Sequence, residues 1–273
     1  MADTLAHRVF SASVFVPVIL LSVWLGGPVF FVLVVGIVGR GVWELYTVAA
    51  TAGYRPLWRL GIVLSVGLCC YIYFIGPSDL YRVLLGVVAL CLLAGLSGGT
   101  ERYTANTMLT LGGVLYLGFL GSAPLLIIRM AGALHREEAA YLLIGLLCCI
   151  WLTDALAYTC GRLWGRRKLV PSISPGKTVG GFVGGLVGGM MPLLLYGWVP
   201  LFGMAELAGL LFLCSASGQL GDLVESAFKR DMGIKDAPTL IPGHGGVLDR
   251  FDSYLIALPM AYLYIEILGV FNR

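Results

Sequence analysis

Apolar runs long enough to cross about 30 Å of hydrocarbon recur along the whole 273-residue chain. The stretches between them are too short to form a soluble domain. Hydrophobic residues make up 59% of the chain and charged residues 12%, and the mean hydropathy is +0.91. A chain this apolar cannot present a polar surface to water as a globular protein. The sequence therefore predicts one all-α domain over residues 1–273, a polytopic integral membrane protein.

The apolar runs predict about nine transmembrane helices. Their expected ranges are 9–26, 29–50, 57–75, 80–98, 107–128, 140–160, 180–198, 200–222 and 252–270. Residues 1–140 hold the N-terminal group of these helices. A cleaved signal peptide is the alternative for the first run. We expect a retained helix, because the small residues 11–13 that a peptidase would need lie inside the apolar run and not after it.

The basic residues predict the orientation of the chain in the membrane. With nine helices, fourteen of the 18 lysines and arginines fall on one side and four on the other. Basic residues are enriched in cytoplasmic loops. We therefore expect a cytoplasmic N-terminus and a C-terminus on the opposite side.

The seventh predicted helix opens with GGFVGGLVGG. Gly180, Gly184 and Gly188 recur at four-residue spacing, and a second glycine follows each of them. Such a row lets two helix backbones approach closely inside lipid. We interpret it as a packing surface, and no two-halved repeat of the kind found in many transporters is visible.

The first charged segment, residues 154–181, reads DALAYTCGRLWGRRKLVPSISPGKTVGG and is expected on the cytoplasmic side. Its GKT does not complete a phosphate-loop motif, because Pro171 occupies the position five residues before Gly176 where a glycine is required. Lys177 and Thr178 follow a Pro-Gly pair that predicts a turn, with a helix directly after it. The first amides of a helix favour an anion. The basic residues 166–168 are expected to contact either this anion or the headgroups of membrane lipids.

Four polar residues at the end of the eighth predicted helix are spaced at i, i+3, i+4 and i+7. They are Asp222, Glu225, Ser226 and Lys229. This spacing places them on one helical face. An ionised side chain near the centre of a membrane helix costs about 2.5 to 3.5 kcal/mol. Two carboxylates on this face therefore need a partner, and a metal ion or a cationic loop would serve.

A second pair of carboxylates begins the last predicted helix. Asp249 and Asp252 are about one turn apart, with Arg250 between them. Carboxylates from two helices are suited to a hard cation. An internal salt-bridge network of these acids with Lys229, Arg230 and Arg250 is the alternative.

Between these helices the chain reads IPGHGG. Its glycines allow backbone conformations that are closed to other residues, and exposed amides in such a turn can surround phosphate oxygens. His244 lies between glycines and close to the carboxylates in sequence. It is therefore a candidate functional residue, together with Gly245 and Gly246, and a structural turn is the alternative reading.

Carboxylates for a hard cation, several basic side chains and a glycine turn all fall at the cytoplasmic ends of membrane helices. This combination indicates phosphoryl or nucleotidyl transfer to a lipid.

The segment SAFKRDMGIKDAPTLIPGHGGVLDRFDS resembles the signature of phosphatidate cytidylyltransferases, also called CDP-diacylglycerol synthases. The family pattern contains S-x-F-K-R, then K-D, then P-x-H-G-G-x-x-D-R-x-D. Its fixed positions are present here as Ser226, Phe228, Lys229, Arg230, Lys235, Asp236, Pro242, His244, Gly245, Gly246, Asp249, Arg250 and Asp252. With GDLVES and the first charged segment, the specific resemblance covers residues 150–260, which are therefore expected to be the catalytic region with two cytoplasmic loops.

The resemblance implies transfer of the cytidylyl group of CTP to phosphatidate in phospholipid biosynthesis, with magnesium required. The implied catalytic residues are Asp222, Lys229, Asp249 and Asp252, of which Asp222 and Asp249 would hold the metal. The implied substrate-binding residues are Lys177, Thr178, Ser226, Arg230, Lys235, His244, Gly245, Gly246 and Arg250. The expected partners are CTP, phosphatidate and membrane lipids, with no nucleic acid, and a homodimer is one option. The expected location is a bacterial inner membrane, with the site on the cytoplasmic side.

Two residues depart from the family pattern. Pro238 stands where a small residue is usual, which affects the path of the loop. Gly180 stands where a glutamate or glutamine commonly follows the lysine-threonine pair. This second change removes a polar side chain near the expected site.

Three other functions remain open at this point. A CTP-dependent lipid kinase, or a nucleotidyltransferase acting on another lipid phosphate, would share the loop chemistry and differ in acceptor. An anion transporter would also gather charge at helix ends, although its site is expected near the midplane of the membrane. An inactive or scaffolding relative is the third alternative, because of Gly180.

Overall fold

The structure is a computed structural model that describes residues 15–130, 136–195, 202–234 and 246–272. The described part of each predicted membrane segment is mainly helical. Within these described ranges, six helices are long and apolar enough, by length and composition, to cross a membrane. They cover Gly27–Thr51, Leu80–Gly98, Tyr103–Met130, Arg136–Trp164, Met204–Asp231 and Leu248–Leu268. Three shorter apolar helices cover Phe15–Leu25, Trp58–Phe74 and Val179–Leu195. The prediction of an all-α polytopic membrane protein is confirmed, whereas nine crossings and a cytoplasmic N-terminus remain predictions.

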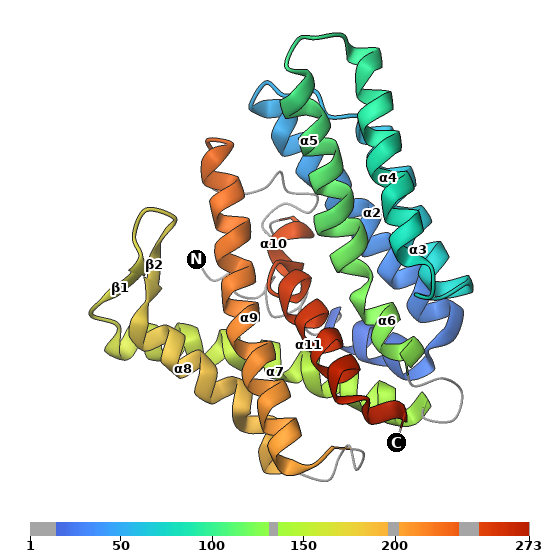
Figure 1. The fold of residues 1–273 in the computed structure, drawn as a ribbon. Helices are drawn as coiled ribbons and strands as arrows, with labels where there is room; N and C mark the ends of the chain where they lie inside the picture. The colour runs from blue at the N-terminus through green and yellow to red at the C-terminus, as the bar shows by residue number, and fades with distance from the viewer. Residues whose placement is uncertain (1–14, 131–135, 196–201, 235–245, 273) are drawn as a thin grey trace. The chain divides into compact units, whose positions relative to one another are not determined.

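The chain folds into two compact units, Met1–Arg129 with Met232–Arg250 and Met130–Asp231 with Phe251–Arg273. The described part of the first unit begins with the helix Phe15–Leu25, and its other described elements come after this helix in the chain. They are α2 (Gly27–Thr51), α3 (Trp58–Phe74), α4 (Leu80–Gly95), η1 (Leu96–Gly98), α5 (Tyr103–Gly113), the π-helical η2 (Val114–Phe119), η3 (Leu120–Ser122), α6 (Ala123–Met130) and the start of α10 (Leu248–Phe251). In Figure 1, α4 and α5 lie side by side, and they are in contact.

A buried tyrosine holds three helices of the first unit together. Tyr46 of α2 is 2% exposed, and its hydroxyl donates a hydrogen bond to the carbonyl of Thr110 on α5 at 2.6 Å. The ring occupies space left by Gly61 of α3 and Gly113 of α5, where an added Cβ would meet it. One aromatic side chain therefore sets the spacing of α2, α3 and α5.

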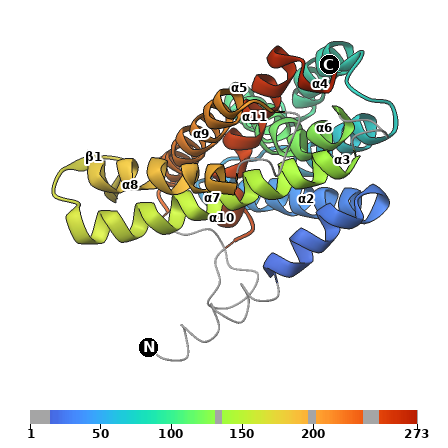
Figure 2. The same cartoon turned by 90° about the horizontal axis from the view of Figure 1, so that it is seen from below.

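The second unit consists of four long or medium helices and a small hairpin. Its elements are α7 (Arg136–Trp164), β1 (Lys168–Val170), β2 (Ser174–Thr178), α8 (Val179–Met190), η4 (Met191–Leu195), α9 (Met204–Asp231), α11 (Tyr254–Leu268) and η5 (Val270–Asn272). Figure 2 shows α8 lying along α7, and α9 also contacts α7, α8 and α11.

Both rows of glycines on α8 are packing surfaces, as the sequence predicts. An added Cβ on Gly181 would lie 2.8 Å from the carbonyl oxygen of Ala157 on α7, and Gly184 and Gly188 face the same helix. A Cβ on Gly185 would instead lie 2.7 Å from the side chain of Gln219 on α9. The absence of side chains on α8 therefore brings its backbone against backbone atoms of α7 and leaves room for side chains of α9.

The β1–β2 hairpin is a feature that the sequence analysis missed. Its strands are antiparallel, with Lys168 opposite Thr178 and Val170 opposite Ser174. The prediction of a Pro-Gly turn at Lys177 was wrong, because residues 174–178 are extended strand and the turn lies at residues 171–173. Pairing with β1 outweighs the local turn preference. The predicted helix start after Thr178 is correct.

Candidate functional site

A pocket of about 460 Å³ lies in the second unit, between the C-terminal half of α7, the hairpin, the start of α8 and α9. Its volume is in the range of small-molecule sites. It is lined by Asp154, Ala157, Tyr158, Gly161, Arg162, Leu169, Ser174, Gly176, Lys177, Thr178, Gly181, Phe182, Gln219 and Asp222. The pocket thus combines apolar walls with two carboxylates, two cations and several hydrogen-bonding groups.

Polar cross-links fix the three helices around this pocket. The Thr153 hydroxyl of α7 donates to Ser215 Oγ of α9 at 2.8 Å, and Ser215 Oγ donates to the carbonyl of Gly185 on α8 at 3.2 Å. Gln219 Nε2 donates to the Phe182 carbonyl at 3.2 Å. All three side chains are buried, at 8% exposure or less. Hydrogen bonds between closely packed helices hold the pocket walls in register.

Lys177 and Asp222 meet in this pocket. Lys177 Nζ lies 2.7 Å from Asp222 Oδ2 and donates to the Gln219 carbonyl at 3.4 Å. Both charged side chains are partly exposed, at 24% and 37%. Next to Lys177, the Thr178 side chain accepts the Gly181 N–H at 3.1 Å and caps α8. The structure therefore brings together one predicted metal ligand and the predicted phosphate-binding pair.

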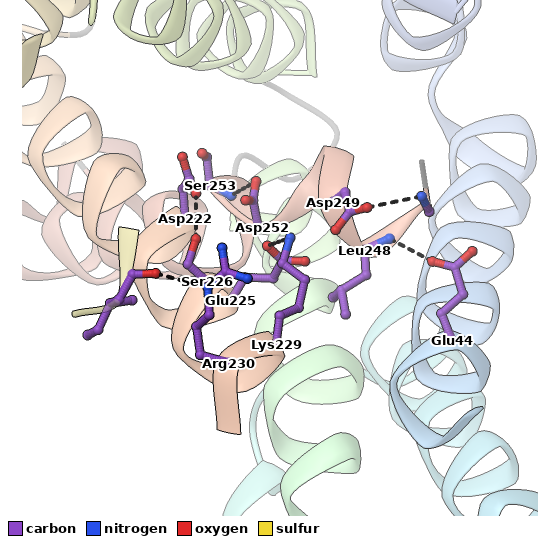
Figure 3. Close-up of polar contacts among 12 residues, drawn as sticks. Glu44, Asp222, Glu225, Ser226, Lys229, Arg230, Leu248, Asp249, Asp252 and Ser253 are labelled. Atoms are coloured by element: carbon purple, nitrogen blue, oxygen red, sulfur yellow. Dashed lines mark hydrogen bonds and ion pairs between the residues drawn. The ribbon is translucent and has the colours of Figure 1, made fainter. Parts of the chain in front are cut away.

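Two carboxylates of α9 and one from the turn between α10 and α11 form a cluster (Figure 3). One oxygen from each of Asp222, Glu225 and Asp252 lies within 4.8 Å of the others. Glu225 is 1% exposed and pairs with Lys229 Nζ at 2.7 Å, which confirms that these residues share a helical face. Asp252 is 9% exposed, and its Oδ1 accepts the Ser253 N–H at 2.6 Å.

The donor set of this cluster fits a hard divalent cation. Carboxylate oxygens are the ligands that Mg²⁺ and Ca²⁺ prefer. Two of the side chains come from α9 and Asp252 comes from the turn between α10 and α11, and a cation among them would offset the repulsion of gathered negative charge. The predicted metal pair was Asp222 and Asp249. The structure places Glu225 and Asp252 beside Asp222, and Asp249 belongs to the first unit, so magnesium binding and its ligand set remain predictions.

Two further predicted residues lie close to α9. Ser226 Oγ donates to Asp222 Oδ1 at 3.4 Å, one turn along the helix. Arg230 Nε donates to the Ile173 carbonyl at 3.3 Å, which ties the end of α9 to the hairpin turn. The pair Lys229–Glu225 is one that the alternative, an internal salt-bridge network, would contain.

The other predicted residues fall in the first unit or outside the described ranges. Lys235, His244 and Gly245 lie outside the described residues. Asp249 Oδ2 accepts the Gly246 N–H at 3.2 Å, within the first unit. The Arg250 side chain is exposed, and its backbone N–H donates to the Val247 carbonyl at 3.1 Å.

Three residues near the carboxylates were not among the predicted site residues. Asp154 and Gln219 line the pocket, and Glu225 belongs to the carboxylate cluster. Asp154 carries a signal in the sequence, because an ionisable residue inside an apolar helix is a candidate functional residue by default. Gln219 carries no such signal, since its partners come from α8.

The chain is similar in sequence to proteins of one known family. The model of the cytidylyltransferase family matches residues 6–268. The chain is similar to the phosphatidate cytidylyltransferase of Haemophilus influenzae, with 31% identity over 97% of this chain and 100% of that protein. It is 45% and 48% identical to the phosphatidate cytidylyltransferases of Staphylococcus aureus and Staphylococcus epidermidis, each over 46% of this chain. These staphylococcal matches span about half, 49%, of the relatives' own length.

Proposed function

The chain belongs to the cytidylyltransferase family, and from this premise we propose that it transfers the cytidylyl group of CTP to phosphatidate. The products are CDP-diacylglycerol and pyrophosphate, and the setting is phospholipid biosynthesis. The observation that carries this proposal is the pocket in which Lys177, Thr178 and Asp222 meet, beside a carboxylate cluster. Family membership supports the substrates, and the pocket supports chemistry between phosphates.

The proposed reaction needs no general base from the protein. A phosphate oxygen of phosphatidate, already ionised at neutral pH, forms a bond to the α-phosphorus of CTP. The bond from that phosphorus to the oxygen bridging to the β-phosphate breaks, and the electron pair leaves with pyrophosphate. The protein must therefore align two polyanions and stabilise the charge on the leaving group, which is work for fixed cations and metal ions.

The groups of the pocket are suited to this task. Lys177 offers a positive charge, and α8 begins beside it at Thr178, so the positive end of the helix dipole lies at the same wall of the pocket. A fixed cation and the positive end of a helix both stabilise phosphate oxygens. Gln219 holds Lys177 through its carbonyl and holds α8 through its side chain, so the cation and the helix start are kept together.

A magnesium ion is part of the proposal. Asp222, Glu225 and Asp252 would hold it, and the family resemblance adds Asp249 as a further candidate. A bound Mg²⁺ would supply charge neutralisation for the triphosphate. The remaining work of alignment falls to the side chains of the pocket.

A direct assay tests the reaction and its nearest alternatives. We expect purified protein given CTP, phosphatidate and Mg²⁺ to form CDP-diacylglycerol and pyrophosphate in equal amounts. Diacylglycerol in place of phosphatidate tests for a CTP-dependent lipid kinase, which would release CDP and form phosphatidate. Other lipid phosphates test for a different acceptor. Product from diacylglycerol alone, or no turnover of phosphatidate with CTP, would contradict the proposal.

We propose that the pocket faces the cytoplasm of a bacterial inner membrane. The distribution of basic residues supports this orientation. In a cysteine-free background, Ser172→Cys in the exposed hairpin turn should react with an impermeant thiol reagent only from the cytoplasmic side. Ser78→Cys, exposed between α3 and α4, should react only from the opposite side. Labelling of both from one side would contradict the predicted topology.

A further inference from the structure

A fully buried carboxylate lies in α2, within the half of the chain that carries no signature motif. Glu44 has 0% of its surface exposed. An ionised carboxylate inside an apolar helix is costly unless it is paired and hydrogen-bonded. Its presence therefore calls for specific partners, and the structure provides two.

The first partner is Arg40, one turn earlier on α2. Arg40 Nε lies 3.1 Å from Glu44 Oε1, and the guanidinium also lies 4.0 Å from the centre of the Trp43 ring. The arginine balances the charge of Glu44. It lies beside Oε1, so the second carboxylate oxygen, Oε2, can accept a hydrogen bond from another group.

The second partner comes from the other end of the sequence. Glu44 Oε2 accepts the backbone N–H of Leu248 at 2.9 Å, across 204 positions of the chain (Figure 3). Leu248 is the first residue of α10, and the first amides of a helix have no acceptor within the helix. Glu44 therefore acts as a cap supplied by a distant helix. A helix of four residues is too short to be stable without such outside contacts.

Helix α2 also contacts the signature segment at a second place, before residues 235–245. Val48 and Ala49 of α2 pack with Met232 in a buried cluster, and Ile234 packs against it. Val48 is one turn after Glu44, so both contacts come from neighbouring positions on α2. Residues 232 and 248 bracket most of the signature segment. The segment is thus attached to α2 at Met232 and at Leu248.

We infer that Glu44 is a positioning residue for the signature segment, a role that rests on the proposed function. Its carboxylate holds the N–H of Leu248 and so sets where α10 begins. Asp249 follows directly and ties Gly246 back to α10 through its own carboxylate. Glu44 touches no reacting group in this account. It acts through α10, which carries the candidate residues Asp249 and Arg250.

Two substitutions of Glu44 separate hydrogen bonding from charge. Glu44→Ala removes the acceptor for the Leu248 amide, whereas Glu44→Gln keeps an acceptor oxygen and removes the charge. Hydrogen exchange of the Leu248 amide reports the bond directly and does not depend on activity. We expect exchange in Glu44→Ala to become about fivefold faster or more, with Glu44→Gln close to the unaltered protein.

Activity gives the second measurement. Mutation of a residue that orients a metal ligand or a catalytic residue typically lowers activity or metal affinity by about ten- to a hundredfold. We expect Glu44→Ala to lose kcat in this range and to need more Mg²⁺ for half-maximal rate, with most activity retained in Glu44→Gln. Tyr46→Phe is the control, because it removes a buried hydrogen bond from α2 without touching α10.

The outcomes separate the inference from the proposed function. Unchanged exchange at Leu248 in Glu44→Ala would overturn the inference. So would a loss of kcat no greater than that of Tyr46→Phe at matched thermal stability, or equal losses in both Glu44 variants. If the unaltered protein makes no CDP-diacylglycerol, the proposed function fails, and the exchange experiment still decides whether Glu44 holds α10.

Discussion

The two units of the molecule bring their helices together in different ways. In the first unit a single aromatic ring, that of Tyr46, fills the space left by Gly61 and Gly113. In the second unit α8 has glycines on two faces. One face lies against backbone carbonyls of α7, and the other accommodates the side chains of Gln219 and Ser215 of α9. Polar side chains of α7 and α9 then hydrogen-bond across the contact.

This difference bears on how the pocket of the second unit is held in shape. Backbone contact between α7 and α8 leaves little freedom for these helices to slide, since the neighbouring atoms are fixed by the helices' own hydrogen bonds. Lys177 of β2 is joined to α9 by its ion pair with Asp222 and its hydrogen bond to the Gln219 carbonyl. A site for phosphates needs charged groups kept in fixed positions. In the first unit, α2 contacts the signature segment through the hydrogen bond of Glu44 to Leu248 and through the packing of Val48 and Ala49 against Met232.

The largest expected effect comes from removing a carboxylate charge in each unit. Asp222→Asn keeps the size of the side chain and removes a candidate metal ligand from the cluster. We expect activity to fall by about a hundred- to a thousandfold or more, with thermal stability nearly unchanged. The measurement is CDP-diacylglycerol formation by purified variants across Mg²⁺ concentrations.

Asp249→Asn tests whether the first unit also supplies a metal ligand. A loss as large as that of Asp222→Asn would extend the ligand set to the first unit, as the family resemblance implies. A loss below about tenfold, roughly 1.4 kcal/mol, would confine it to the cluster of the second unit. His244→Gln should cost less than either, because no proton must be moved. Near-normal rates in both aspartate variants with an inactive His244→Gln would refute the metal-centred account.

The next effect concerns the cation of the pocket. Lys177→Ala removes a charged hydrogen-bond donor, and we expect kcat/KM to fall by about ten- to a hundredfold. Lys177→Arg should restore part of it. Lys168→Ala is the matched control, because Lys168 is an exposed residue of the same hairpin that does not line the pocket. Equal losses in the two alanine variants would mean that the hairpin's overall charge matters and the pocket position does not.

A smaller effect should appear in stability at the α7–α8 contact. Gly181→Ala places a Cβ 2.8 Å from a backbone carbonyl of α7, and we expect it to lower the free energy of unfolding by about 1 to 3 kcal/mol. Gly180→Ala is the neighbouring control. Its Cβ would have ordinary contacts of 3.4 Å or more, so little loss is expected, and Gly180→Gln should be tolerated. Unfolding of purified protein in detergent measures both, and equal losses would contradict the backbone-contact interpretation.

The smallest effect is expected in the first unit. Gly113→Ala also creates a close contact, 2.5 Å from the Tyr46 ring. A side chain can move more readily than a helix backbone, so the loss of unfolding free energy should be below that of Gly181→Ala. The same unfolding measurement decides the order. A larger loss for Gly113→Ala would reverse the proposed difference between the units.

Short-range patterns in the sequence predicted the parts of the site that lie on one helix. The i, i+3, i+4, i+7 spacing correctly placed Asp222, Glu225, Ser226 and Lys229 together, as the contacts on α9 confirm. The start of α8 after Thr178 was also correct. The strand at residues 174–178 was missed, because its conformation depends on pairing with residues 168–170 and the Pro-Gly pair alone indicates a turn.

The sequence by itself determined that this chain is a polytopic helical membrane protein and which acidic and basic residues gather near its helix ends. Both follow from local physics, since apolar length decides membrane insertion and helical periodicity decides which side chains share a face. Only the tertiary structure decided that Lys177 meets Asp222, that Asp252 joins Glu225, and that Glu44 caps α10. These contacts join residues from 27 to 204 positions apart. Their geometry depends on how closely the helices pack, which no local pattern specifies.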